Sequence, residues 1–106
     1  MPASRRPHRS TERVTIETIR GRRERVTLPS PMWEGHVKVG TGLTLEAIYY
    51  GPRTGRMFAR HYSIWQRNDG TGRVEGTTYS EIDPDEYLHL CNLADVEPIG
   101  VDARPV

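Results

Sequence analysis

The stretch from Leu43 to Ala94 constrains the fold of this chain more than any other. Alternating apolar residues occupy the segments 43–50 and 56–65, on either side of the loop 51–55, which reads Gly-Pro-Arg-Thr-Gly. Alternation with a period of two is typical of a strand with one buried face, and glycine and proline mark a turn. The stretch therefore predicts a β-hairpin.

A helix is predicted directly after the last strand of this stretch. Asp83 can act as the N-cap, Pro84 suits the first helical position, and Glu86 can complete a capping box. Apolar side chains then recur at i, i+3, i+4 and i+7 from Tyr87 to Ala94, which gives the helix one apolar face. This face can pack against a sheet.

Further strands are expected before and after the central hairpin. Residues 14–19 and 23–28 are rich in β-branched residues and predict an N-terminal hairpin, and residues 33–39 predict a short third strand. The sequence Asn-Asp-Gly-Thr-Gly at 68–72 is a strong turn signal, and residues 74–82 follow it as the last, outer strand.

Together these elements predict a single α+β domain over residues 13–95. We expect an antiparallel sheet of about five to six strands in a largely meander-like order, with one C-terminal helix packed on a face. Residues 1–12 combine dense positive charge with no apolar periodicity, so we expect a flexible basic arm there. The prolines and glycine of residues 96–106 predict an extended C-terminal tail.

The central hairpin can pair in two registers. In the first, Tyr50 pairs with Arg56 and Glu46 pairs with Arg60, an opposite-charge pair that contributes a few tenths to about 1 kcal/mol. A slip by one residue places Ala47 opposite Arg60 and loses this pair, so we prefer the first register. Its predicted core-facing side carries Leu43, Leu45, Ala47, Tyr49, Met57, Ala59 and Trp65. Its other side, expected to face solvent or a partner, carries Glu46, Arg56, Arg60 and Tyr62.

Charges are segregated along the chain. Residues 1–28 hold eight Arg against three Glu, a net charge of +5, whereas residues 81–106 hold seven acidic residues against Arg104, a net charge of −6. Such asymmetry is typical of polyanion binding by the basic part. The two ends could equally neutralise each other within one chain or between subunits.

We expect a cytoplasmic protein with no membrane partner. The one cysteine, Cys91, cannot form an intramolecular disulfide, and the first residues lack the apolar core of a signal peptide. The apolar runs are far shorter than the roughly 20 residues that span a bilayer. With 106 residues and a mean hydropathy of −0.68, the chain can form one small core.

No metal, cofactor or catalytic site is predicted. The four histidines and Cys91 lack the paired spacing of zinc ligands, and the glycine-rich turns lack the context of phosphate-binding loops. Glu46, Arg60, His61 and Tyr62 are of the residue types that small ribonucleases use. In the preferred register His61 points away from the other three, which argues against their convergence on one phosphate.

The leading functional hypothesis is a small non-enzymatic accessory or regulatory module that binds nucleic acid. Arginine neutralises phosphates, and strand-borne aromatic side chains stack on bases. The predicted nucleic-acid-binding residues are Arg5, Arg6, Arg9, Tyr50, Arg53, Arg56, Arg60, Tyr62 and Arg67.

Two alternatives remain open. The first is a protein-interaction or inhibitor-like module, which would use an exposed sheet edge and the acidic C-terminal helix, with Asp85 and Glu86 as contact residues. The second is a small ribonuclease that uses His61. The sequence does not distinguish among DNA, RNA, a protein partner and self-association.

Overall fold

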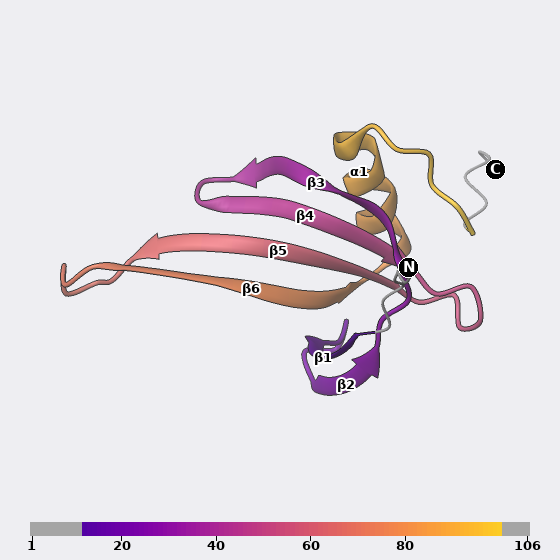
Figure 1. The fold of residues 1–106 in the computed structure, drawn as a ribbon, viewed down its shortest axis with the longest axis horizontal. Coiled ribbons are helices and arrows are strands. Elements are labelled where there is room, and N and C mark those ends of the chain that lie inside the picture. Colours follow the sequence, from indigo (N-terminus) through magenta and orange to yellow (C-terminus); the bar gives the residue numbers. More distant parts are fainter. Residues whose placement is uncertain (1–11, 101–106) are drawn as a thin grey trace, which may run out of the picture.

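Six strands and one helix make up residues 12–100, the part of the chain that this computed structural model describes (Figure 1). The elements in chain order are β1 (Arg13–Glu17), β2 (Arg23–Thr27), β3 (Pro31–Gly40), β4 (Leu43–Tyr50), β5 (Met57–Gln66), β6 (Arg73–Ile82) and α1 (Pro84–Ala94). The predicted α+β class and the single C-terminal helix are confirmed. Residues 1–11 and 101–106, which hold most of the predicted arm and half of the predicted tail, lie outside the described residues.

The sheet is mixed, and the prediction of a purely antiparallel sheet was wrong. Its strand order is β2-β1-β6-β5-β4-β3, so β3 to β6 form a meander while β1 and β2 form a separate hairpin. β1 runs parallel to β6, and the two strands pair at Glu17 and Ser80. Alternation within a strand indicates which of its faces is buried but not which remote strand lies beside it, so the sequence pattern could not predict this contact.

Both registers considered for the central hairpin occur in it. Between Glu46 and the loop, the strands follow the slipped register, in which Ala47 pairs with Arg60. On the other side of Glu46 they follow the preferred register, in which Leu45 pairs with His61. A bulge at Glu46 joins the two parts. Because side chains alternate along a strand, one extra residue moves all that follow it to the opposite face. The prediction of one continuous register was therefore wrong for the residues nearest the loop.

As a result, the sheet has an apolar core on each face. α1 covers one face, where the buried side chains are Leu45, Ile48, Met57, Ala59, Ile82, Tyr87, Leu90 and Cys91. The β1–β2 hairpin covers the other, where the buried side chains are Ile16, Leu28, Ala47, Tyr49 and Phe58. α1 and the β1–β2 hairpin therefore pack against opposite faces of the β3–β6 meander, and the hairpin lies next to β6, away from α1 (Figure 1).

Two parts of the predicted core-facing side were wrong. Ala47 and Tyr49 lie on the face opposite Leu45, because the bulge separates them from it. Trp65 is 52% exposed, since β5 and β6 extend past the end of the β3–β4 hairpin and no other element covers them there (Figure 1).

α1 begins and ends where the sequence predicts. Asp83 Oδ1 accepts a hydrogen bond of 2.8 Å from the backbone N–H of Glu86, and Pro84 opens the helix. At the other end Asp95 adopts the left-handed conformation, with φ 58° and ψ 46°. Within residues 12–100 it is the one non-glycine residue with a positive φ.

Replacing Asp95 by glycine is expected to raise the free energy of unfolding by about 0.5–1 kcal/mol. Glycine adopts positive φ without steric cost, and the substitution removes a negative charge from the negative end of the helix dipole. Urea unfolding monitored by circular dichroism measures the change. Asp95→Asn, which removes the charge and keeps a side chain, is the control and should give a smaller gain. A loss of stability in Asp95→Gly would contradict this explanation.

The described part of the C-terminal tail packs back onto the domain. Tyr87 is fully buried, and its hydroxyl donates to the carbonyl of Ile99 at 2.8 Å and accepts from the N–H of Ile99 at 2.9 Å. The hydroxyl of Tyr50 donates to the carbonyl of Gly100 at 3.5 Å. Residues 96–100 are therefore held by two aromatic side chains of the α1 face.

Candidate functional site: the cleft between β1 and β6

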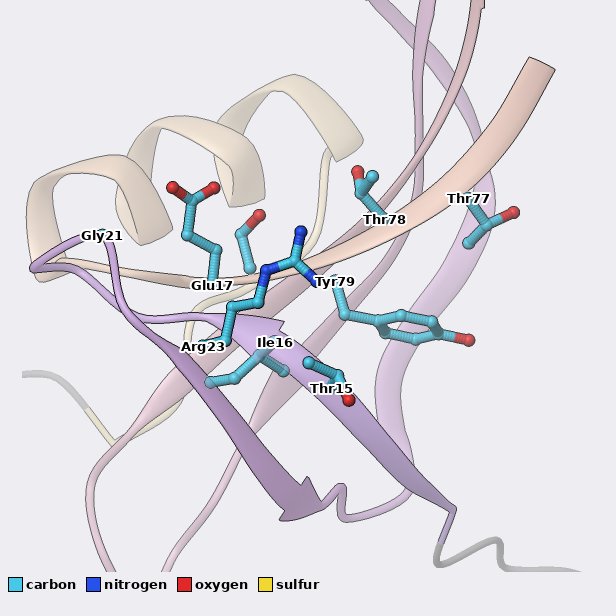
Figure 2. A pocket seen from close by; sticks show the side chains of 9 residues that line it. Thr15, Ile16, Glu17, Gly21, Arg23, Thr77, Thr78 and Tyr79 are labelled. Carbon is cyan, nitrogen blue, oxygen red and sulfur yellow. The ribbon is translucent and has the colours of Figure 1, made fainter. Parts of the chain in front are cut away.

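β1 and β6 are neighbours in the sheet but pair at a single position, Glu17 with Ser80. Before this position the two strands separate, and a cleft of about 400 Å³ opens between them (Figure 2). Its lining residues are Thr15, Ile16, Glu17, Gly21, Arg23, Thr77, Thr78, Tyr79 and Ser80. The cleft is therefore bounded by the edge of β6 on one side and by the β1–β2 hairpin on the other.

The outer edge of β6 presents backbone hydrogen-bonding groups to this cleft. Arg67 donates its N–H to the carbonyl of Gly72, and from there the β5–β6 register continues without a shift. In an antiparallel pair, residues whose backbone groups point to the neighbour alternate with residues whose groups point away. Every second residue from Val74 to Ser80 therefore bonds to β5. The residues between them direct their N–H and C=O groups to the outer edge of β6. These residues are Arg73, Glu75, Thr77 and Tyr79.

The other edges of the sheet are protected against pairing with a further strand. β3 begins with Pro31, carries the exposed Lys38, and shifts register against β4 at three places. β2 is five residues long and mostly charged. Proline, lysine, bulges and short length all discourage edge-to-edge pairing, whereas the β6 segment 73–79 has no proline and no register shift.

Arginine side chains surround the hairpin side of the cleft. The pairs Glu17–Arg23, Thr15–Arg25 and Arg13–Thr27 place these side chains on one face of the hairpin, opposite the buried Ile16. The turn adds Arg20 and Arg22. All five arginines are exposed, and none of them forms an ion pair with another residue in the range 12–100.

Arg23 is the arginine that lines the cleft itself. Its side chain extends from β2 toward β6, whereas the carboxylate of Glu17 points away from it (Figure 2). The two residues are cross-strand neighbours, but no ion pair joins them. The guanidinium of Arg23 can therefore meet a group that enters the cleft.

Arg56 fixes the position of the hairpin, and hence the geometry of the cleft. It bonds to both carboxylate oxygens of Glu24 on β2, at 3.0 and 3.3 Å, and to both of Glu81 on β6, at 3.1 and 3.2 Å. Glu81 Oε1 also accepts from the N–H of Ile19, at 3.4 Å. The guanidinium lies 5.4 Å from the centroid of the Phe58 ring. The hydrogen bonds that Arg56 donates to Glu24 lower the pKa of this carboxyl group, so Glu24 stays ionised.

Two arginines of the predicted nucleic-acid face are held in internal ion pairs. Arg56 bridges the two glutamates just described. Arg60 lies 3.5 Å from Glu46 and 3.4 Å from Glu34, and it donates to the hydroxyl of Tyr49 at 3.1 Å. Burial raises the pKa of Tyr49 to about 12, so its hydroxyl stays protonated. The structure thus brings these arginines together with acidic residues on the sheet face that the hairpin partly covers.

The remaining predicted contact residues are spread over the molecule. Tyr50 lies on the α1 face against Tyr87, whereas Tyr62 lies on the opposite face and bonds to Glu75. Arg53 is in the loop between β4 and β5, and Arg67 is in the turn between β5 and β6. The predicted contacts in the basic arm, at Arg5, Arg6 and Arg9, lie outside the described residues. Asp85 and Glu86, the predicted contacts of the protein-interaction hypothesis, are exposed on the first turn of α1.

The cleft was only partly visible in the sequence. The prediction that the last strand is an outer strand was wrong, because β6 lies between β1 and β5. An exposed sheet edge was part of one hypothesis, but Thr77, Tyr79 and Arg23 were not predicted as site residues. The run from Val74 to Tyr79, which has β-branched residues and no proline, was the available signal. What was missing was the position of β1, since no local pattern places it beside β6.

The acidic and basic groups considered for catalysis lie on two faces of the sheet. Glu46 contacts Arg60 on the hairpin side, whereas His61 lies on the α1 side in line with Ala59. The histidine that does approach Glu46 is His36, at 3.7 Å. Burial lowers the pKa of His61 below its ordinary value of 6.5, an effect that Glu86 partly opposes.

The low pKa of His61 predicts a pH-dependent contribution to stability. The unfolded chain binds a proton at His61 at higher pH than the folded protein does, so protons favour unfolding. Stability from this group is complete above about pH 6.5 and is lost as the pH falls through the folded-state pKa. Urea midpoints between pH 7.5 and 5 should therefore fall more steeply for the natural protein than for His61→Gln. Equal slopes would contradict the prediction.

Several kinds of site are absent from residues 12–100. No three His, Cys, Asp or Glu side chains gather there in an arrangement that could hold a metal ion. Cys91 is buried, which raises the pKa of its thiol. The helix that the structure describes over this range is too short and too polar to span a membrane. Comparisons of this chain with protein-family models, with curated proteins and with solved structures found no match.

Proposed function

We propose that this chain is a non-enzymatic binding module that captures an extended segment of a partner protein by strand addition at the outer edge of β6. One observation carries the proposal: β6 is an interior strand by sheet order, yet over residues 73–77 its outer backbone groups have no partner strand among residues 12–100. Strand addition gives affinity through main-chain hydrogen bonds and specificity through alternate side chains.

The cleft supports this role by its shape. It lies between a strand edge and a separate hairpin, so an added strand would have β6 on one side and the hairpin side chains on the other. The single contact at Glu17 and Ser80 closes one end. A segment of about six or seven residues would extend from this end to Arg73, since an added strand rises about 3.3 Å per residue, as β6 does.

Hydrogen exchange tests the open edge. In the free protein the amides of Glu75 and Thr77 should exchange quickly, whereas those of Gly76 and Thr78 should be protected by β5. Peptides selected from a random displayed library should slow the exchange of Glu75 and Thr77 and leave the other two unchanged. Protection of Glu75 and Thr77 in the free protein would show that the edge is closed and would contradict the proposal.

The matched variants are Thr77→Pro and Thr77→Ala. Proline removes an outward N–H and is tolerated where this group faces solvent, whereas alanine keeps the N–H. We expect Thr77→Pro to weaken selected peptides at least tenfold while the fold, followed by circular dichroism, is retained. Thr77→Ala should bind nearly as the natural protein does. Peptides whose affinity is the same for both variants would rule out strand addition.

Nucleic-acid binding is a second candidate, favoured by the five exposed arginines of the β1–β2 hairpin. Phosphate contacts by arginine weaken steeply with salt. A single-stranded oligonucleotide should therefore bind at 50 mM salt and lose most of its affinity at 200 mM. Absence of binding at low salt would exclude this candidate. We place it second because the open β6 edge offers alternating donors and acceptors that match a peptide backbone and not a sugar-phosphate chain.

A further inference from the structure

The charge around the cleft indicates the chemistry of the segment that it accepts. A strand added along Glu75 and Thr77 sends every second side chain to the sheet face that carries Thr78 and Ser80. Glu17 pairs with Ser80 and Arg23 pairs with Glu17, so Arg23 stands on the same face. The added side chains therefore approach its guanidinium.

Other charged residues of the hairpin also favour a negatively charged partner. Arg13 and Arg25 follow Arg23 on the outer face of the hairpin, and no ion pair within residues 12–100 neutralises them. Glu24 is bound by Arg56 on the opposite face, and Glu17 is the one acidic residue that lines the cleft. The cleft and the outer face of the hairpin thus carry three arginines against Glu17, and none of these four residues forms an ion pair within residues 12–100.

Hydroxyl groups add neutral donors to this surface. Thr15, Thr78 and Ser80 all line the cleft, and each can donate a hydrogen bond to a carboxylate oxygen. A guanidinium with nearby hydroxyls suits a carboxylate, because hydrogen bonds to charged groups are about twice as strong as neutral ones. An ammonium group would meet like charge at Arg23, and Glu17 would be the one anionic acceptor for it in the lining of the cleft.

We infer that the captured segment is acidic, with Asp or Glu side chains at alternate positions on the face that meets Arg23. The inference rests on the proposed strand addition and specifies its partner. A free C-terminal carboxylate offers the same chemistry at one position only, so the two sources can be separated by blocking the C-terminus.

The test uses fluorescein-labelled heptapeptides in which Val alternates with Glu, Gln or Lys, each with an amidated C-terminus, measured by fluorescence anisotropy against the full chain. We expect the Glu peptide to bind roughly tenfold more tightly than the Gln peptide and the Lys peptide to bind least. Arg23→Gln should remove most of the preference for Glu over Gln. Lys38→Gln, which makes the same charge change on β3 at the opposite edge of the sheet, should leave the preference intact.

The outcomes separate the inference from the proposal beneath it. Equal binding of the Glu and Gln peptides, weakened in both by Thr77→Pro, would overturn the acidic preference and leave strand addition standing. Tight binding of the Gln peptide only when its C-terminus is free would assign the carboxylate to the chain end and overturn the side-chain assignment. Binding of the Glu peptide that is unchanged in Thr77→Pro, and exceeded by a single-stranded oligonucleotide, would overturn both in favour of a polyanion surface.

Discussion

Replacing Tyr87 by alanine is expected to lower the free energy of unfolding by about 3–5 kcal/mol, the largest effect of any single substitution we propose. The ring is fully buried at the centre of the α1 core, between the helix and the sheet. Truncation leaves a cavity and also frees the tail that the hydroxyl holds. Because the folded state of a small domain is stable by only about 5–15 kcal/mol, much of the protein should unfold in moderate urea.

Tyr87→Phe isolates the hydroxyl and keeps the packing. This hydroxyl donates to and accepts from the backbone of Ile99, and it lies 3.3 Å from the sulfur of Met32. Its loss should cost about 1–2 kcal/mol and release residues 96–100, which limited proteolysis followed by mass spectrometry would detect. Tyr62→Phe is the control, since its exposed bond to Glu75 should contribute well under 1 kcal/mol. Equal losses in the two variants would contradict a special role for Tyr87.

Replacing Arg56 by alanine is expected to lower the free energy of unfolding by about 1–3 kcal/mol. The side chain of Arg56 is 30% exposed and that of Glu81 is 14% exposed, so the variant leaves a largely buried carboxylate without its cation. The cost is below that of a fully buried pair, because the bond to the more exposed Glu24 is screened by solvent. Urea unfolding of the Arg56→Ala, Glu24→Gln and double variants gives the coupling energy between the two residues.

Arg56→Lys distinguishes the geometry of the contact from its charge. Lysine keeps the positive charge but cannot offer paired hydrogen bonds to two carboxylates at once. We expect it to recover less than half of the loss, and amide exchange in β1 and β2 should stay faster than in the natural protein. Full recovery by lysine would show that charge alone holds the hairpin. A loss of stability with unchanged exchange in the hairpin would place the contribution of Arg56 elsewhere.

The sequence predicted those elements whose causes are local. The N-cap at Asp83, the turn at 68–72 and the turn between β1 and β2 depend on residues close together in the chain, and the structure has each of them as expected. Glu46 and Arg60 form an ion pair at 3.5 Å, but the prediction that they are register partners was wrong, because Arg60 pairs with Ala47 beside the bulge. A bulge makes two registers compatible, and a choice between two continuous registers could not include it.

The parts that could not be predicted depend on contacts between remote segments. The hairpin covers Tyr49 and Phe58 only because β1 lies beside β6, more than 60 residues away in sequence. The same contact creates the cleft and brings Glu24 and Glu81 to Arg56. An arginine in an alternating segment reads as a surface residue, since its sequence neighbours do not show which carboxylates will reach it.

The parallel contact of β1 with β6 also sets an order of assembly. The hairpin is the first described element to leave the ribosome, but the surface on which it docks is complete only when β6 has been made. The hydrogen bond from the N–H of Ile19 to Glu81 cannot form before β6 is made. Ile16 and Leu28 likewise stay unpacked until Phe58 of β5 is present. Contacts of such large sequence separation form late, because the entropy of closing a long loop is lost before any stabilising contact is made. During synthesis the hairpin should therefore leave its apolar face uncovered, and nascent chains stalled before residue 82 should be more prone to aggregation than the completed domain.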